Sequence, residues 1–112
     1  MLRKYYQQTT ENILAYYEFK FCPAYISITK TLHQAVLLSY LVALHKTKDS
    51  KEFAYMDEVF IKYLNFKIGV LTHSKKSLKY LGFINVRIAG KPARCHYTIN
   101  MDKINQALEE MK

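Results

Sequence analysis

Apolar side chains recur at helical spacing along most of the chain, which predicts a largely helical protein. The longest apolar stretch, Ala35 to Leu44, is apolar nearly all round, so we expect its helix at the centre of a small domain. Thr31 is a suitable N-cap for this helix, which should end at about Lys46. Four more helices are expected at residues 10–17, 57–64, 67–81 and 102–111.

Two segments alternate at period two and predict a β-hairpin, with residues 89–93 as its turn. The side chains expected on its inner face are those of Ile84, Val86, Ile88, Cys95, Tyr97 and Ile99. The side chains expected on its outer face are those of Asn85, Arg87, Arg94 and His96. A further short strand is expected at 52–55. Residues 19–28 are aromatic and β-branched but interrupted by Pro23, which favours an extended or edge segment.

The order of these elements is helix, short strand, helix, short turn, helix and hairpin, which is the winged helix topology. Asn65 tolerates the left-handed geometry of the short turn, and Gly82 ends the helix that follows. We therefore predict an α+β, mostly helical fold: a winged helix-turn-helix with extra N- and C-terminal helices. Residues 1–112 form one domain, with a core at about 31–100, an N-terminal extension at 1–30 and a C-terminal helix at 101–112.

Three short motifs resemble those of a known family. The sequence LNFK at 64–67 looks like the turn of a helix-turn-helix, and LKYLGFI at 78–84 resembles the join between a recognition helix and the first wing strand. The segments GKP at 90–92 and YTIN at 97–100 are similar to the wing and exit strand of phage and plasmid replication-initiation or replisome-organiser proteins. The resemblance covers about Thr31 to Asn100 and implies a DNA-binding module. Lys67 departs from it, because Ser, Thr or Asp usually caps the recognition helix.

The charge of the chain is concentrated in one segment. The net charge is +8, from 17 basic and 9 acidic residues, and no Asp or Glu occurs between Val59 and Met101. The basic residues of this acid-free segment are Lys62, Lys67, Lys75, Lys76, Lys79, Arg87, Lys91 and Arg94. The rest of the chain is neutral. A field of one sign attracts a polyanion, and nucleic acid is the commonest one.

The helix expected at 67–81 carries most of the candidate DNA contacts. Leu71, Ser74, Leu78 and Leu81 should face inward. The outer face and its flank then offer Gly69, Thr72, His73, Lys75, Lys76, Lys79 and Tyr80 to the major groove. Lys91 and Arg94, with Arg87 behind them, would place the wing on the backbone or in the minor groove. The competing interpretation is an ordinary solvated, basic surface that only aids solubility.

No catalytic or cofactor motif occurs in the sequence. It has no metal-ligand spacing, no glycine-rich phosphate loop and no G-x-S-x-G turn, so we expect neither an enzyme nor a cofactor. Cys22 and Cys95 lie far apart and are expected as free thiols in a reducing, cytoplasmic setting. Neither a signal peptide nor a membrane span is expected.

The sequence therefore favours a duplex DNA-binding protein, acting as a transcriptional regulator or as an accessory replication protein of a mobile element. Two alternatives remain open: a winged helix that docks another protein without touching DNA, and an RNA-binding or nucleoid-type protein. The apolar stripes of the terminal helices need cover. They either pack on each other within one chain or build a homodimer, which is slightly favoured. The stripe residues are Ile13, Leu14, Tyr17, Ile104, Ala107, Leu108 and Met111.

Overall fold

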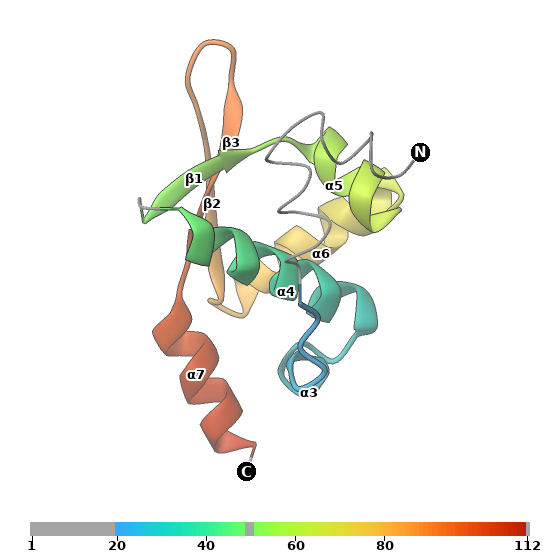
Figure 1. Cartoon of the computed structure of the whole chain (residues 1–112), viewed down its shortest axis with the longest axis vertical. Helices are drawn as coiled ribbons and strands as arrows, with labels where there is room; N and C mark the ends of the chain where they lie inside the picture. The colour runs from blue at the N-terminus through green and yellow to red at the C-terminus, as the bar shows by residue number, and fades with distance from the viewer. Residues whose placement is uncertain (1–19, 49–50, 112) are drawn as a thin grey trace.

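The structure is a computed structural model that describes residues 20–48 and 51–111. In these ranges the elements are α3 (Tyr25–Thr29), α4 (Leu32–Thr47), β1 (Glu52–Tyr55), α5 (Asp57–Leu64), α6 (Ile68–Tyr80), β2 (Ile84–Ala89), β3 (Arg94–Ile99) and α7 (Met101–Glu110) (Figure 1). This composition confirms the predicted α+β class, mostly helical, and the predicted element order from α4 to the hairpin. The helix expected at 10–17 lies outside the described residues.

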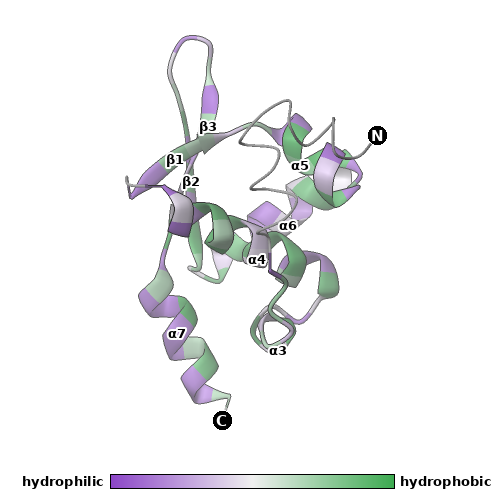
Figure 2. Ribbon diagram, viewed as in Figure 1, coloured by the Kyte–Doolittle hydropathy of each residue, from purple (hydrophilic) through white to green (hydrophobic). Residues whose placement is uncertain are grey.

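Helix α4 forms the centre of the fold, as its apolar sequence predicts. The Thr31 hydroxyl accepts a hydrogen bond from the Gln34 N–H at 3.2 Å, so the helix begins where a cap is available. Leu37, Leu38 and Leu41 are fully buried along it. In Figure 2 most of α4 has the green of hydrophobic residues. A helix that is apolar on nearly all sides needs cover all round, and α3, α6 and β3 supply it.

The expectation of an extended segment at 19–28 is wrong for its second half. Tyr25–Thr29 forms the short helix α3, which follows a turn at Pro23 and Ala24. Proline is tolerated just before a helix because its missing N–H would have no partner there. Lys30 ends α3 in the left-handed region (φ 74°), and its N–H donates to the Ile26 carbonyl at 2.7 Å. The aromatic and β-branched composition favours an extended segment, but as a helix the segment buries Tyr25 and Ile28 against the core, and this packing outweighs the local preference.

Helices α5 and α6 are joined by the predicted short turn. Asn65 adopts the left-handed conformation (φ 56°) that ends α5. Lys67 stands at the N-cap of α6 without a side-chain hydrogen bond, so the helix begins at Ile68. Gly82 has the positive φ of 84° expected after the helix. The predicted turn between α5 and α6, and the predicted start and end of α6, therefore agree with the structure within one residue.

The three strands form an antiparallel sheet in the order β1-β3-β2. Tyr97 of β3 lies opposite Phe53 of β1 and Val86 of β2. The inner face at Ile84, Tyr97 and Ile99 is buried, as predicted. Ile88 departs from the expectation, since it is 73% exposed. The hairpin continues past the helices it packs on (Figure 1). Alternation places Ile88 on the inner side of this projecting part, and the described residues leave it exposed.

Aromatic rings fill the space between α4, α5 and the sheet. The Phe60 ring packs edge-on against Tyr40 and Tyr97, with centroids 5.6 and 5.8 Å away. The hydroxyl groups of Tyr40 and Tyr55 are hydrogen-bonded to each other, which satisfies a polar atom inside the core. Burial raises the pKa of Tyr40, and the bond to Tyr55 adds to that effect. The cluster therefore joins the central helix to the outer strand β1.

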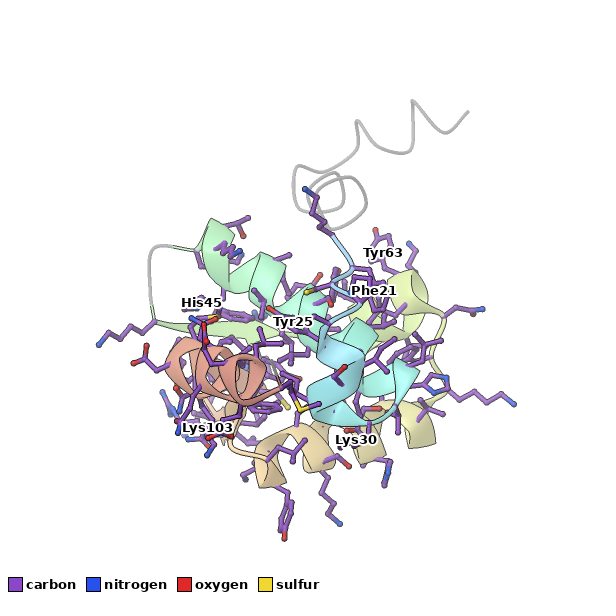
Figure 3. All side chains as sticks on the ribbon, turned by 90° about the horizontal axis from the view of Figure 1, so that it is seen from below. Phe21, Tyr25, Lys30, His45, Tyr63 and Lys103 are labelled. Carbon is purple, nitrogen blue, oxygen red and sulfur yellow. The ribbon has the colours of Figure 1, made fainter. Side chains whose placement is uncertain are left out.

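The C-terminal helix α7 packs beside α3 on the underside of the molecule (Figure 3). Ile104 is fully buried there, Ala107 and Leu108 are half-buried, and Met111 is exposed. The stripe predicted on this helix is thus largely covered within one chain, by α3. Its expected partner, the stripe of the helix at 10–17, lies outside the described residues, and the homodimer stays a prediction. Within the ranges described, every helix is too short or too polar to cross a lipid bilayer.

Candidate nucleic-acid interface

Helix α6 turns one apolar face inward and presents the other to solvent. Leu71, Ser74 and Leu78 are buried at spacings of three and four, as predicted. The opposite face carries six of the predicted contact residues, all exposed: Gly69, Thr72, His73, Lys76, Lys79 and Tyr80. Tyr80 is 90% exposed, which is unusual for an aromatic side chain. The exposed face therefore combines two lysines, an imidazole, a hydroxyl and an aromatic ring.

Lys75 lies inside the domain and not on this face, and its ammonium group is already paired. Its side chain is only 15% exposed, and its Nζ lies 2.7 Å from Oδ1 of Asp57. The same ammonium group donates to the Tyr97 hydroxyl at 3.2 Å. The sequence placed Lys75 at the flank of the helix, where a small rotation decides between solvent and core. A carboxylate at the start of α5 fixed the outcome, because it pairs with a cation that burial would otherwise penalise.

Burial of Tyr97 raises the pKa of its hydroxyl, and the nearby negative charge of Asp57 adds to the shift. The hydroxyl therefore stays protonated and accepts the hydrogen bond from Lys75 as a neutral group. In this way α5, α6 and β3 meet at one ammonium group. The contact holds α6 at a fixed rotation about its own axis, with its lysine-bearing face turned outward.

The wing presents two of the three predicted basic residues. Lys91 and Arg94 are exposed at the end of the hairpin, next to Gly90, whose φ of 98° permits the turn. The exposed Ile88 adds an apolar side chain to the same end. The wing tip thus combines two cations with one apolar group, well away from the core.

Arg87, the third basic residue predicted for the wing, is paired with an acidic residue. Its guanidinium group donates two hydrogen bonds to the Glu52 carboxylate, at 2.7 and 2.6 Å. The hydrogen bonds from Arg87 hold the pKa of Glu52 below its ordinary value. Both side chains lie on the outer face of the sheet, whereas α6 packs on the inner face. The sequence could not reveal this pairing, because Glu52 lies 35 positions away and on a different strand.

The acid-free segment is therefore only partly compensated. Asp57 and Glu52, which precede it in the chain, neutralise Lys75 and Arg87. The other cations at the interface have no acidic partner among residues 20–48 and 51–111; they are Lys76, Lys79, Lys91 and Arg94. Uncompensated cations on exposed elements produce the single-signed field that the composition predicts.

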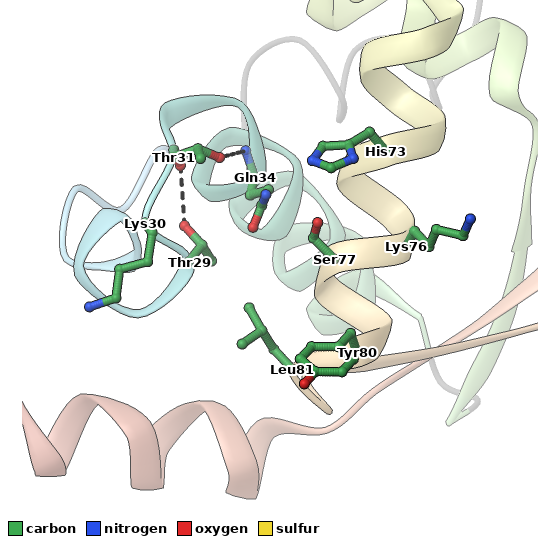
Figure 4. A pocket seen from close by; sticks show the side chains of 9 residues that line it. All are labelled: Thr29, Lys30, Thr31, Gln34, His73, Lys76, Ser77, Tyr80 and Leu81. Atoms are coloured by element: carbon green, nitrogen blue, oxygen red, sulfur yellow. Dashed lines mark hydrogen bonds between the residues drawn. The ribbon is translucent and has the colours of Figure 1, made fainter.

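A cleft of about 470 Å³ borders the exposed face of α6 and was not foreseen from sequence. Its other wall is the junction between α3 and α4, with Lys30, Thr31 and Gln34 (Figure 4). Neither Lys30 nor Gln34 belongs to a sequence motif, and Gln34 reads as one polar position in an apolar helix. Their proximity to His73 and Lys76 appears only when α4 packs across α6.

Elsewhere in the described ranges, His, Cys, Asp and Glu side chains do not gather in groups of three that could hold a metal ion. Cys22 and Cys95 are free and half-buried. No model of a known protein family matches the chain, and no curated protein or solved structure shows significant similarity to it.

Proposed function

We propose that this chain is a winged helix-turn-helix protein that binds duplex DNA, with α6 entering the major groove. The observation that carries the proposal is the exposed face of α6, where Lys76 and Lys79 have no acidic partner among the described residues. A helix of this width fits the major groove of B-form DNA. The element order, the antiparallel sheet order and the motifs at 64–67 and 78–84 are compatible with this assignment.

The wing supplies the second contact. Lys91 and Arg94 extend past the core on the hairpin and lie on the DNA backbone or in the minor groove. The lysines act mainly through phosphate charge, so they contribute affinity on any sequence. Thr72 and His73 are the side chains of α6 suited to reading base edges. The resemblance of the motifs favours a regulator of transcription or an accessory replication protein of a mobile element.

The test is a binding titration against duplex DNA at two salt concentrations. Lys76→Ala and Arg94→Ala should weaken binding on all sequences and lower the salt slope by about one each. The chain offers matched controls. Lys46 lies in the last turn of α4, outside the proposed interface, and Arg87 is paired with Glu52. Lys46→Ala and Arg87→Ala should therefore leave the salt slope unchanged.

A selection from random duplexes separates sequence reading from charge. Thr72→Ala or His73→Ala should change the preferred base at one position, at a cost of about 1–3 kcal/mol, with the salt slope retained. Parallel titrations with single-stranded DNA and RNA distinguish a duplex binder from an RNA binder. If Lys76→Ala and Arg94→Ala bind as tightly as the parent at both salt concentrations, the DNA interface is refuted. A winged helix that docks a protein then becomes the better hypothesis.

A further inference from the structure

The cleft between α6 and the α3–α4 junction contains a buried polar group that the fold does not use. Gln34 is only 6% exposed, yet its side-chain amide has no hydrogen-bond partner among the described residues. In Figure 4 the amide points into the cleft, between Thr29 and Ser77. The donor and acceptor atoms of this amide are therefore left facing the cleft, where a ligand can pair with them.

The surroundings of this amide favour an anion. Among the described residues no acidic side chain lines the cleft, whereas Lys30 and Lys76 stand on its two sides. The first turn of α4 also borders it and contains no acidic residue, so the positive end of that helix is uncompensated. The Ser77 hydroxyl and the His73 imidazole complete the polar lining. The groups that converge here are mostly hydrogen-bond donors and positive charges.

The junction that carries these groups is already held in place. The Thr29 hydroxyl lies 2.8 Å from the Tyr25 carbonyl oxygen and 3.2 Å from that of Thr31, bridging the end of α3 to the start of α4. The left-handed backbone at Lys30 turns the chain between the two helices. The cleft is therefore formed before any ligand arrives, which lowers the entropy cost of binding.

From these contacts we infer that the cleft is a phosphate site, in which the Gln34 amide and the Ser77 hydroxyl donate to the phosphate oxygens. Lys30 and Lys76 balance its charge. The inference deepens the proposed function and rests on it for one point only, the source of the phosphate. A DNA strand that runs beside α6 brings a backbone phosphate to this cleft, so the interface extends from α6 to the start of α4.

The test follows the side-chain amide of Gln34 by NMR in the full chain. Inorganic phosphate should shift the two amide proton signals and saturate, whereas sodium chloride at equal ionic strength should not. Gln34→Met removes these signals, so in that variant the backbone amide signal of Ser77 is followed instead; it should shift with phosphate in the parent and not in Gln34→Met. This variant should also leave the melting temperature unchanged or raise it, because an apolar group replaces an unpaired amide. Gln106→Met, on the exposed side of α7, is the matched control and should retain the phosphate response.

Titration with duplex DNA then identifies the source. Gln34→Met should weaken duplex binding about tenfold, the loss expected for one hydrogen bond to a charged group. Lys30→Ala should lower the salt slope by about one. If phosphate shifts the amide but Gln34→Met binds duplex as the parent does, the site stands and a free phosphate compound is its source.

Two further outcomes separate this site from the proposed function. Failure of phosphate to shift the Gln34 amide beyond the chloride control overturns the phosphate site, whether or not the parent binds duplex DNA. Failure of the parent to bind duplex DNA overturns the proposed function, and a saturable phosphate response in the same protein still supports the site.

Discussion

The Nζ atom of Lys75 lies 2.7 Å from Oδ1 of Asp57, and this contact fastens the middle of α6 to the first residue of α5. The neighbouring residue, Lys76, is exposed and has no acidic partner among the described residues. Two adjacent lysines thus have opposite surroundings. One holds the helix in position, and the other belongs to the proposed interface.

Replacing these lysines one at a time should separate stability from binding. Lys75→Met removes charge-assisted hydrogen bonds inside the domain and should lower the free energy of unfolding by about 1.5–3 kcal/mol. Lys76→Ala should change it by less than about 0.5 kcal/mol. Urea unfolding measures both. Equal effects of the two substitutions on stability would contradict the positions given to these side chains.

Gly69 offers a test of how closely α6 approaches a phosphate. A Cβ added at this position meets no atom within 4 Å, so Gly69→Ala should raise the free energy of unfolding by about 0.5–1 kcal/mol. The added methyl group should nevertheless weaken duplex binding, if the backbone there lies against DNA. Thermal unfolding and a DNA titration give the two values.

Gly82→Ala is the contrasting substitution. Gly82 has φ of 84°, which an alanine adopts at a cost of about 1–2 kcal/mol, so this variant should lose stability. Its position beside Lys103 of α7 lies away from the exposed face of α6. A stable Gly82→Ala variant would show that the turn after α6 is formed differently.

Truncation of the central helix should be severe. Leu41 is fully buried, so Leu41→Ala should lower the free energy of unfolding by about 2–5 kcal/mol through lost burial and a cavity. Leu32, on the first turn of the same helix, is 57% exposed. Leu32→Ala should therefore cost less than about 0.5 kcal/mol. Melting temperatures that fall equally would mean that α4 is not the buried centre.

The bridge between Glu52 and Arg87 predicts a dependence of stability on pH. Arg87 holds the folded pKa of Glu52 below its ordinary value of 4.5. The bridge therefore stabilises the fold fully above that ordinary value, and its contribution is lost as pH falls through the lowered folded pKa. The stability difference between the parent and Glu52→Gln should thus shrink on acidification below about pH 4.5. Parallel stability curves at every pH would rule the bridge out.

The sequence was sufficient for elements whose pattern is local. The cap at Thr31, the left-handed Asn65 and the buried stripe of Leu71 and Leu78 depend on neighbours within a few positions, and all were predicted. The exposure of Ile88 could not be predicted in this way. Alternation shows which face of a strand a side chain is on, but it does not show where the layer that covers this face ends.

The candidate site was harder to predict than the fold, since its charges are settled by distant partners. Local pattern places Lys75 at the flank of its helix and Arg87 behind the wing tip, but it does not show that either cation is paired. Asp57 and Glu52 form these pairs through contacts across 18 and 35 positions. Gln34 was overlooked for the same reason, because only the packing of α4 across α6 places its amide in a cleft.

Helix α4 connects the cleft to the sheet as a single rigid body. Gln34 lies in its first turn, and Tyr40, in its middle, is hydrogen-bonded to Tyr55 of β1. Sixteen residues give the helix a length of about 24 Å, with no proline or glycine to bend it. The helix therefore fixes the distance between the cleft and strand β1, which pairs with β3 of the wing. One residue inserted between Gln34 and Tyr40 would turn these two contacts about 100° out of register.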